Sequence, residues 1–340
     1  MFFDIFKKNK KYISCEYLEH GIHFHVDGIF HCCCCFHSDA NNEPVIKSTN
    51  NIDKDFNDFI KAKKIARNEF RKGNIIHRCK DCFHLKEKIW DNENIIKLLS
   101  ITANKKCNCD CVYCDTHIDK IGNNLVPDLP VYDFILKLHK AKLIAADCYI
   151  DIGGGEPTIH FEFEKLLAFL MDITNTRICI HTSAVKYSNM IENLIKQNRA
   201  NVVISIDSGN SDLYKKIKNV DKFDIVSENI KKYCQAQENT TELHQVALKY
   251  IILPEVNDKY DYMIEFLQHA KKLGCHAIRT DVESRWYKEN MNNIDSVKYM
   301  LKLQKFLAIN SQKKGFQHFF YLTANGLYNN NIDIYNSIEI

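Results

Sequence analysis

The sequence lacks the features that would direct the chain to a membrane, a secretion pathway or a polyanion. No uncharged apolar stretch reaches the roughly 18 residues that a membrane helix needs. The apolar run within MFFDIFKKNKKYIS at the N-terminus is too short for a signal-peptide core, and lysines follow it. The 46 basic and 43 acidic residues leave a formal net charge of only +3. We therefore expect a cytoplasmic protein with no membrane partner and no nucleic-acid partner.

The composition is otherwise that of an ordinary globular protein, with one exception. Hydrophobic residues make up 45% and charged residues 26% of the 340 positions, which suits two domains or one large α/β domain with an extension. The exception is cysteine, which occurs 15 times. Because thiols stay reduced in the cytosol, so many of them indicate metal or redox chemistry rather than disulfides.

The cysteines are unevenly distributed. Three groups lie at or before Cys114: Cys15 with Cys32–Cys35, the pair Cys79 and Cys82, and the stretch CNCDCVYC over 107–114. Free cysteine is among the most buried residue types. We therefore interpret the four isolated residues as core residues: Cys148, Cys179, Cys234 and Cys275.

After residue 95 the chain alternates short apolar runs with amphipathic stretches. Period-two and buried patterns predict six strands, over 95–102, 147–155, 177–183, 201–209, 244–253 and 275–283. Helical spacing predicts the helices that follow them, over 131–143, 163–173, 187–197, 223–236, 260–274 and 294–310. Repeated βα units predict an α/β fold with a parallel sheet, whose polar motifs gather where the strands end.

The stretch CNCDCVYC follows the first of these strands and has three cysteines in C-x3-C-x2-C spacing: Cys107, Cys111 and Cys114. Structural zinc usually takes four protein ligands, commonly from paired knuckles, and a second knuckle is not adjacent here. Three thiolates in one short loop suit three corners of a cubane iron–sulfur cluster and leave one iron open for a substrate or cofactor. Cys109 falls outside this spacing.

This spacing resembles the radical S-adenosylmethionine (radical SAM) superfamily, whose motif has an aromatic residue just before the third cysteine, here Tyr113. The resemblance implies a partial (β/α)6 TIM-like barrel and a [4Fe-4S] cluster held by Cys107, Cys111 and Cys114. It also implies that S-adenosylmethionine (SAM) chelates the open iron. Reduction of the cluster then cleaves SAM to a 5′-deoxyadenosyl radical, which abstracts a hydrogen atom from a substrate. A reductant such as flavodoxin or ferredoxin is implied as partner.

Further motifs carry the resemblance to the other strand ends. GGGEP after the second strand matches the family's turn, in which residues without Cβ let the backbone approach the methionyl amine. The resemblance thereby assigns cofactor contacts to Tyr113, Gly153, Gly154, Gly155, Glu156, Pro157, Thr182, Ser183, Ser205 and Asp207. The glycine-bearing adenine motif that some members carry after the fifth strand is missing, and IILPEVND stands there instead.

The first 92 residues predict a second metal centre. HVDGIFHCCCCFH predicts a hairpin that turns at Asp27 and Gly28, an amphipathic helix is expected over 56–73, and HRCKDC is a C-x2-C knuckle. This segment resembles the auxiliary-cluster extensions called SPASM or twitch domains, although those usually follow the barrel. The resemblance implies a second [4Fe-4S] cluster on Cys15, Cys33, Cys79 and Cys82. Structural zinc and free thiols are the alternatives.

The sixth strand ends in alternating charged residues. Arg279, Asp281 and Glu283 are expected to share one face and to serve as catalytic or substrate-binding candidates for a polar substrate, with a solvated strand end as the alternative. The following ESRWYKEN places Arg285 and Trp286 where a lid would lie. His181 is interpreted as a structural histidine rather than an acid or base.

These patterns divide the chain into a Cys-rich extension over 1–92, a barrel over 93–315 and a C-terminal tail over 316–340 that covers the barrel edge. The predicted function is radical SAM chemistry on an unidentified polar substrate. The SPASM-like segment favours a peptide or protein slightly over a sugar or nucleotide-linked metabolite. A non-catalytic iron–sulfur or zinc scaffold is an alternative interpretation of the cysteines, but it does not explain the GGGEP motif.

Overall fold

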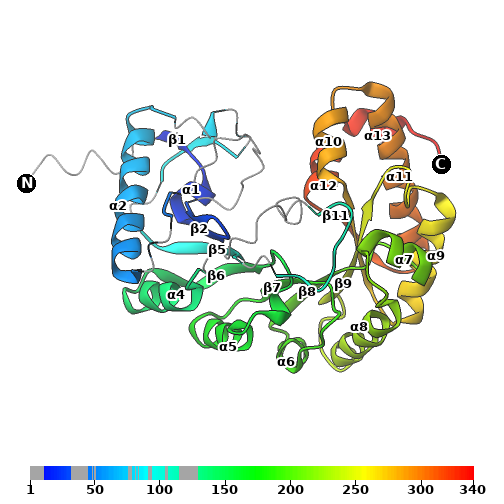
Figure 1. Ribbon diagram of the computed structural model, residues 1–340. Coiled ribbons are helices and arrows are strands. Elements are labelled where there is room, and N and C mark those ends of the chain that lie inside the picture. The colour runs from blue at the N-terminus through cyan, green and yellow to red at the C-terminus, as the bar shows by residue number, and fades with distance from the viewer. Residues whose placement is uncertain are drawn as a thin grey trace, which may run out of the picture. The chain divides into compact units, whose positions relative to one another are not determined.

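The structure is a computed structural model that describes residues 11–31, 45–47, 49, 51–75, 79–80, 82, 84–90, 94–103, 106–114 and 129–340 (Figure 1). The chain forms two compact units. The first comprises Met1–Lys105, Asn124–Gly155 and Phe161–Ile178, and the second comprises Lys106–Asn123, Glu156–His160 and Cys179–Ile340. None of the described helices is both long and apolar enough to cross a membrane.

The first unit contains the strands of the N-terminal segment and the first two strands of the βα series. Its strands are β1 (Tyr12–Ser14), β2 (Gly21–His25), β3 (Gly28–Phe30), β4 (Lys86–Lys88), β5 (Ile96–Thr102) and β6 (Ile144–Ile152). Its helices are α1 (Glu16–His20), α2 (Ile52–Arg71), α4 (Val131–Lys140) and α5 (Phe163–Ile173). β2 runs parallel to β5, and β5 runs parallel to β6, so the N-terminal segment extends the same sheet.

The predicted hairpin is present, but its two-residue turn is Val26 and Asp27, one position before the expected Asp27 and Gly28. β2 and β3 pair antiparallel, and His25 lies opposite Gly28. Gly28 has a φ of 143°, which a residue without Cβ adopts readily at such a turn. The four cysteines that follow this hairpin, Cys32–Cys35, lie outside the described residues.

The second unit contains the remaining strands in the order β7-β8-β9-β10-β11. These are β7 (Ile178–Thr182), β8 (Ala200–Ser205), β9 (Val246–Ile252), β10 (Ala277–Val282) and β11 (Gln317–Phe320), and the pairs from β8 to β11 are parallel. Its helices are α6 (Asn189–Lys196), α7 (Ser211–Lys218), α8 (Phe223–Glu238), α9 (Tyr260–Lys272), α10 (Ser284–Asn290), α11 (Ile294–Lys313), α12 (Leu322–Asn330) and α13 (Ile332–Ser337). A 3-10 turn, Pro157–Ile159, also belongs here.

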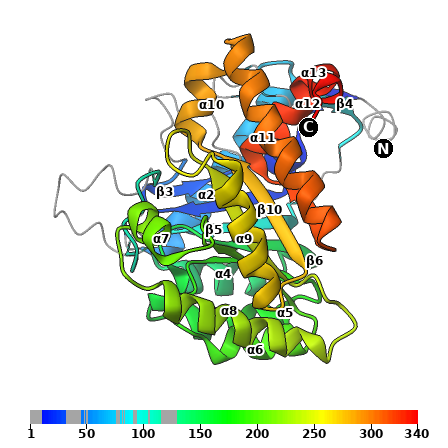
Figure 2. The same cartoon turned by 90° about the vertical axis from the view of Figure 1, so that its right-hand side faces the viewer.

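Helices α8 and α9 cover one face of these strands (Figure 2). Tyr250 of β9, for example, packs on Phe266 of α9 with ring centres 4.8 Å apart, and both side chains are buried. Because side chains alternate along a strand, the odd-numbered neighbours of Tyr250 project from the opposite face. That face carries the polar residues considered below.

The α/β class and all six predicted strand–helix pairs are confirmed. Helix α7 was not predicted, although its signals are in the sequence. Asn210 caps its first turn by accepting a hydrogen bond from the Leu213 N–H at 2.9 Å, and Leu213 and Ile217 face inward at helical spacing. The helix ends at Asn219, which adopts a left-handed φ of 54°.

Candidate active site

The cysteine loop over 107–114 is docked on the C-terminal end of α7. The Asp110 N–H donates to the Lys218 carbonyl at 2.9 Å, and the Val112 N–H donates to the Ile217 carbonyl at 3.0 Å. The last carbonyls of a helix have no intrahelical partner, so α7 offers them to the loop. The loop therefore has a defined position that is set by a helix about a hundred residues away in sequence.

The four cysteines of the loop differ in burial. Cys107, Cys111 and Cys114 are partly exposed, whereas Cys109 is buried. Hydrogen bonding to Cys107 and Cys111 raises the pKa of the Cys109 thiol far above its ordinary value. The hydrogen bond from Cys109, helped by the Lys218 ammonium, lowers the pKa of Cys111 to about 6. A short loop with three partly exposed cysteines, one of them readily deprotonated, has the donor chemistry that an iron–sulfur cluster requires.

Glu156 joins the end of the GGGEP turn to the end of β7. Its carboxylate is buried and accepts hydrogen bonds from the Thr182 hydroxyl at 2.7 Å and the Ser183 N–H at 2.6 Å. It also accepts from the N–H and hydroxyl of Thr158, at 3.1 and 2.6 Å. The Ser183 hydroxyl lies 2.7 Å from Glu156 Oε2 and 2.9 Å from Asn108 Oδ1 in the cysteine loop. Three of the predicted residues, Glu156, Thr182 and Ser183, are thus brought together beside the cysteines.

The glycines of GGGEP allow a close approach of two backbones in the first unit. The Gly153 N–H donates to the Ile101 carbonyl at 2.8 Å and continues the pairing of β5 with β6. Gly154 has a φ of 96°, and a Cβ there would lie 3.0 Å from three backbone atoms of Thr102. Only glycine satisfies both conditions, and the close approach that it allows here is to the backbone of Thr102.

Asp207, just past the end of β8, is buried in a network of side chains. One carboxylate oxygen accepts from the Tyr113 hydroxyl at 2.6 Å and from the Lys218 ammonium, and the other accepts from the Ile251 N–H at 2.7 Å. Both oxygens of the predicted cofactor-binding Asp207 therefore have protein donors. Tyr113, the aromatic residue of the cysteine motif, is anchored by this network.

The charged residues at the end of β10 have different partners. Asp281 is buried, and its Oδ1 accepts from the Ala324 N–H in the first turn of α12 at 3.1 Å. Glu283 forms an ion pair with Arg285 at 2.9 Å, and Arg285 also donates to the Val112 carbonyl of the cysteine loop at 2.9 Å. Arg279 lies with its guanidinium carbon 5.6 Å from the centre of the Tyr321 ring.

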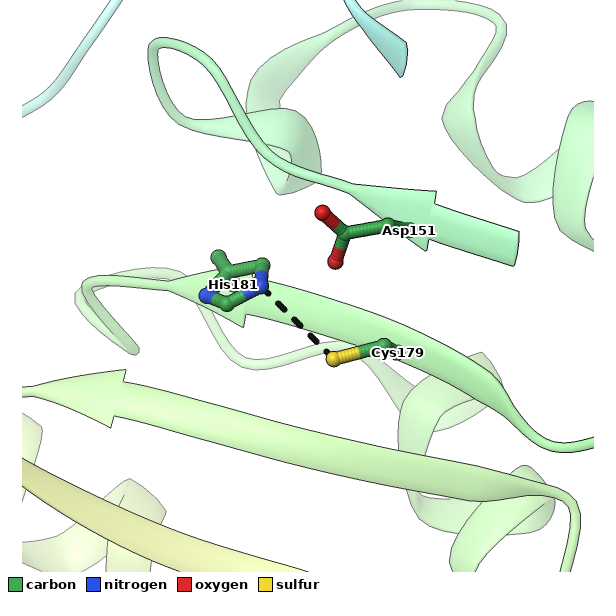
Figure 3. A group of neighbouring side chains, drawn as sticks. All are labelled: Asp151, Cys179 and His181. Carbon is green, nitrogen blue, oxygen red and sulfur yellow. Dashed lines mark hydrogen bonds between the residues drawn. The ribbon is translucent and has the colours of Figure 1, made fainter. Parts of the chain in front are cut away.

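His181 of β7 lies beside Cys179 and Tyr321. Its Nε2 lies 3.6 Å from the Cys179 sulfur (Figure 3). The same atom lies 3.2 Å from the Tyr321 hydroxyl. Sequence reasoning had no means to find Tyr321, which follows β11 and comes 140 residues later.

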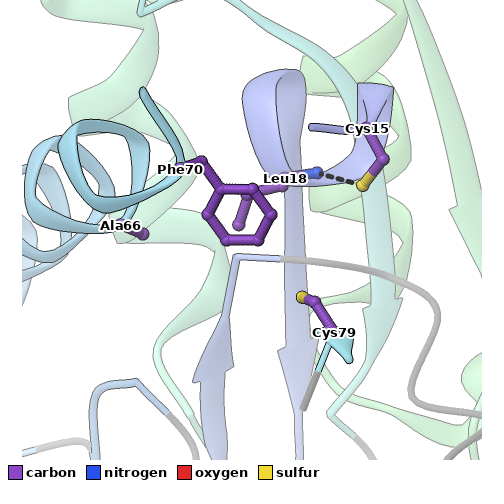
Figure 4. Close-up of a cluster of buried hydrophobic side chains, with 5 residues drawn as sticks. All are labelled: Cys15, Leu18, Ala66, Phe70 and Cys79. Atoms are coloured by element: carbon purple, nitrogen blue, oxygen red, sulfur yellow. Dashed lines mark hydrogen bonds between the residues drawn. The ribbon is translucent and has the colours of Figure 1, made fainter. Parts of the chain in front are cut away.

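In the first unit, two of the N-terminal cysteines share one buried cluster. Cys15 and Cys79 pack there with Leu18, Ala66 and Phe70 (Figure 4). The Cys15 sulfur accepts a hydrogen bond from the Leu18 N–H at 3.3 Å and so caps α1. The Cys82 N–H donates to the Cys79 carbonyl at 3.1 Å, which closes the turn of the knuckle. Cys33, the fourth predicted ligand, lies outside the described residues.

Comparison with known proteins decides the family. The model of the Radical SAM superfamily matches residues 101–279, which is more than half of the chain and includes the cysteine loop, the GGGEP turn and the ends of β7 to β9. The chain belongs to the radical SAM superfamily. Members of this superfamily are enzymes that use a [4Fe-4S] cluster and SAM, as the sequence motif implied.

The relatives found by sequence are similar over part of their length. The GTP 3',8-cyclase of Clostridium botulinum (strain Okra / Type B1) is 27% identical over 183 residues, which cover 51% of this chain and 56% of the relative. The GTP 3',8-cyclase of Thermodesulfovibrio yellowstonii is 26% identical over 245 residues, 68% of this chain and 72% of the relative. The chain thus spans little more than half of the first of these radical SAM relatives.

Among solved structures, SuiB of Streptococcus suis bound to its precursor peptide SuiA has a TM-score of 0.53 and 18% sequence identity, and the match covers 89% of this chain and 61% of SuiB. SuiB bound to S-adenosylmethionine gives a TM-score of 0.51 at 16% identity, covering 78% of this chain and 56% of SuiB. At these identities the likeness concerns the fold of the radical SAM protein. It confirms the predicted class, a partial TIM-like barrel.

Proposed function

We propose that Cys107, Cys111 and Cys114 hold a [4Fe-4S] cluster at which SAM is reductively cleaved. The observation that carries this proposal is the cysteine loop itself. It is held on the end of α7 with three cysteines partly exposed and the fourth, Cys109, buried. The cluster and SAM together supply a 5′-deoxyadenosyl radical, and the protein binds and orients the substrate and excludes water. An external reductant, such as flavodoxin or ferredoxin, provides the electron.

The cofactor contacts that we assign follow the strand ends. Gly154 lets the backbone approach SAM without a side chain in the way, and Gly153, Gly155 and Pro157 shape that turn. Glu156 orients the hydroxyls of Thr182 and Ser183, which we assign to the methionyl group of SAM together with Ser205. To Asp207 we assign the positioning of Tyr113 and thereby of the cysteine loop.

The substrate that we propose is a peptide or protein. Two facts support this choice: the fold likeness to SuiB, a structure that contains a precursor peptide, extends over 89% of the chain, and the N-terminal segment is rich in cysteine. A nucleotide is the second candidate, because the sequence relatives are GTP 3',8-cyclases.

We also propose that Cys15, Cys33, Cys79 and Cys82 hold a second [4Fe-4S] cluster. Cys15 and Cys79 are buried among the same apolar side chains, which supports the second [4Fe-4S] cluster. The N–H that Leu18 donates to the Cys15 sulfur supports it as well. Iron, sulfide and zinc analysis of anaerobically purified protein tests this proposal. A protein that binds two four-iron clusters is expected, and a single cluster together with zinc would reject the second one.

The test of the catalytic proposal is formation of 5′-deoxyadenosine by the reconstituted, reduced protein. The wild type is expected to cleave SAM. A protein that holds an intact cluster but does not cleave SAM would overturn the proposal. Deuterium transfer into 5′-deoxyadenosine from uniformly labelled peptides, compared with transfer from labelled GTP, then decides the substrate class. Transfer from GTP alone would replace the peptide with the nucleotide.

A further inference from the structure

Two cations in the second unit lie beside one aromatic ring. Lys249 of β9 and Arg279 of β10 are partners in the parallel register, so their side chains project from the same face. The Lys249 ammonium lies 5.4 Å and the Arg279 guanidinium carbon 5.6 Å from the centre of the Tyr321 ring. Both distances are in the range of a cation–π contact.

This face is the one opposite the helical layer. Tyr250, next to Lys249, packs on Phe266 of α9, so Lys249 points away from the helices. Ser205 of β8 is the next residue in the same row, because it is the register partner of Lys249. The row therefore runs across three neighbouring strands on the inner side of the second unit.

Neither cation is neutralised by a close partner. Among the described residues, no hydrogen bond or ion pair within 4 Å involves the Lys249 ammonium or the Arg279 guanidinium, and the buried Arg279 Nε lacks any hydrogen-bond partner. Asp281 acts on Lys249 electrostatically, but its Oδ1 already accepts from the N–H groups of Val282 and Ala324. A buried polar atom without a partner is unusual in a folded protein and is a mark of a ligand site.

We propose that Lys249 and Arg279 bind an oxyanion of the substrate, either a carboxylate or a phosphate. A guanidinium beside an ammonium is well suited to such a group, since the first binds it through a planar fork and the second as a point charge. This inference rests on the proposed function, because it places the substrate on the inner face of the strands that end at the SAM site.

The position of the pair along the strands favours the substrate over the methionyl carboxylate of SAM. Asp207, two residues beyond Ser205, accepts from the Tyr113 hydroxyl of the cysteine loop. Ile251, two residues beyond Lys249, belongs to the buried cluster on which Tyr113 packs. Two residues of strand correspond to roughly 6–7 Å. The cations therefore occupy a layer one step further from the cysteine loop than Asp207. Within that layer they lie one and two strands beyond Ser205, the residue of the same row that we assign to SAM.

The test uses the full-length, reconstituted protein and two probes, inorganic pyrophosphate and succinate, with affinity measured by calorimetry under anaerobic conditions. At least one probe is expected to bind the wild type. Lys249→Met and Arg279→Gln are each expected to weaken that binding about tenfold or more, since each removes a charge-assisted contact. Lys298→Met, which removes an exposed lysine of α11, is the matched control and should leave the affinity unchanged.

Several outcomes would overturn the inference. These are the absence of binding of either probe to the wild type, equal binding by all variants, and a comparable loss of SAM affinity, which would assign the pair to the methionyl carboxylate. Arg279→Lys, which keeps the charge and alters the packing less, is expected to retain part of the binding even if Arg279→Gln folds poorly. Because the probes bind without turnover, failure of SAM cleavage would reject the proposed function and leave this result standing.

Discussion

Lys218 and Asp207 form an ion pair that is removed from solvent on both sides, with side-chain exposures of 1% and 0%. The Tyr113 hydroxyl lies 2.6 Å from the Lys218 ammonium and donates to the same carboxylate. Burial by itself lowers the pKa of Lys218, but the Asp207 carboxylate outweighs it and raises that pKa above its ordinary value. Lys218 therefore stays charged, and its contacts with Asp207 and Tyr113 tie the cysteine loop to β8 and α7.

Removing one member of this pair is expected to be costly. Lys218→Met leaves the Asp207 carboxylate buried without its countercharge, which typically costs about 3–5 kcal/mol of unfolding free energy. Urea denaturation measures this loss, and iron content after reconstitution should fall with it, because Tyr113 loses a partner. Lys216→Met, an exposed neighbour on α7, is the control and should change stability little.

The double variant Asp207→Asn with Lys218→Met separates charge from packing. With no unpaired charge left, it is expected to be more stable than Lys218→Met alone. A double variant that is as unstable as the sum of the two single variants would show that the pair does not act as a unit.

The predicted ligand set of the cysteine loop can be tested one cysteine at a time. Cys107→Ala, Cys111→Ala and Cys114→Ala are each expected to abolish formation of 5′-deoxyadenosine, because each removes one thiolate ligand. Cys109→Ala should retain cofactor cleavage, since Cys109 is buried and keeps its proton. Liquid chromatography of the products and iron analysis measure both effects. Equal loss in Cys109→Ala would mean that the ligand set is different.

The GGGEP turn is testable with a pair of matched glycines. Gly154 and Gly73 both have positive φ, 96° and 89°, but a Cβ on Gly73 meets no heavy atom within 4 Å. Gly73→Ala is therefore expected to cost only the backbone strain, about 1 kcal/mol. Gly154→Ala adds a clash with the Thr102 backbone and should cost at least about 2 kcal/mol more, with weaker SAM binding. Similar losses in both variants would argue against the close approach at Gly154.

Stability should decrease in mild acid because of a buried histidine in β2. Burial, with the nearby His25 as the second cause, lowers the pKa of His23 from 6.5 to about 4. The fold favours the neutral ring, whereas the unfolded chain takes up a proton at 6.5. The contribution to stability is thus complete above pH 6.5 and is lost as the pH falls toward 4, by about 3 kcal/mol at most.

Denaturation curves at about pH 7.5 and about pH 5 measure this effect. His23→Gln is expected to lose less stability between the two pH values than the wild type, and His244→Gln, at an exposed position, should behave as the wild type does. Burial also lowers the pKa of His318 to about 4. Both variants therefore keep the pH-dependent contribution of His318 to stability. An unchanged difference in His23→Gln would contradict the prediction.

Much of the fold was predictable because its signals are local. The helix expected over 163–173 has these same bounds in the structure, and the expected hairpin forms with its turn at Val26 and Asp27, one position before the predicted Asp27 and Gly28. The lysine at 249, in the middle of the apolar run VALKYII, was an available signal that went unused. It interrupts a strand in which all the remaining residues are buried. A lysine in such a place indicates a polar inner face.

The sequence by itself determined the six strand–helix pairs, the spacing of the three motif cysteines and the glycine turn, because each depends on residues a few positions apart. Only the tertiary structure decided that Lys218 pairs with Asp207 behind Tyr113, and that Lys249, Arg279 and Tyr321 meet on one face. Those residues come from elements separated by whole βα units. Their contacts arise from the register of parallel strands and the docking of a loop on a helix end, which no local pattern encodes.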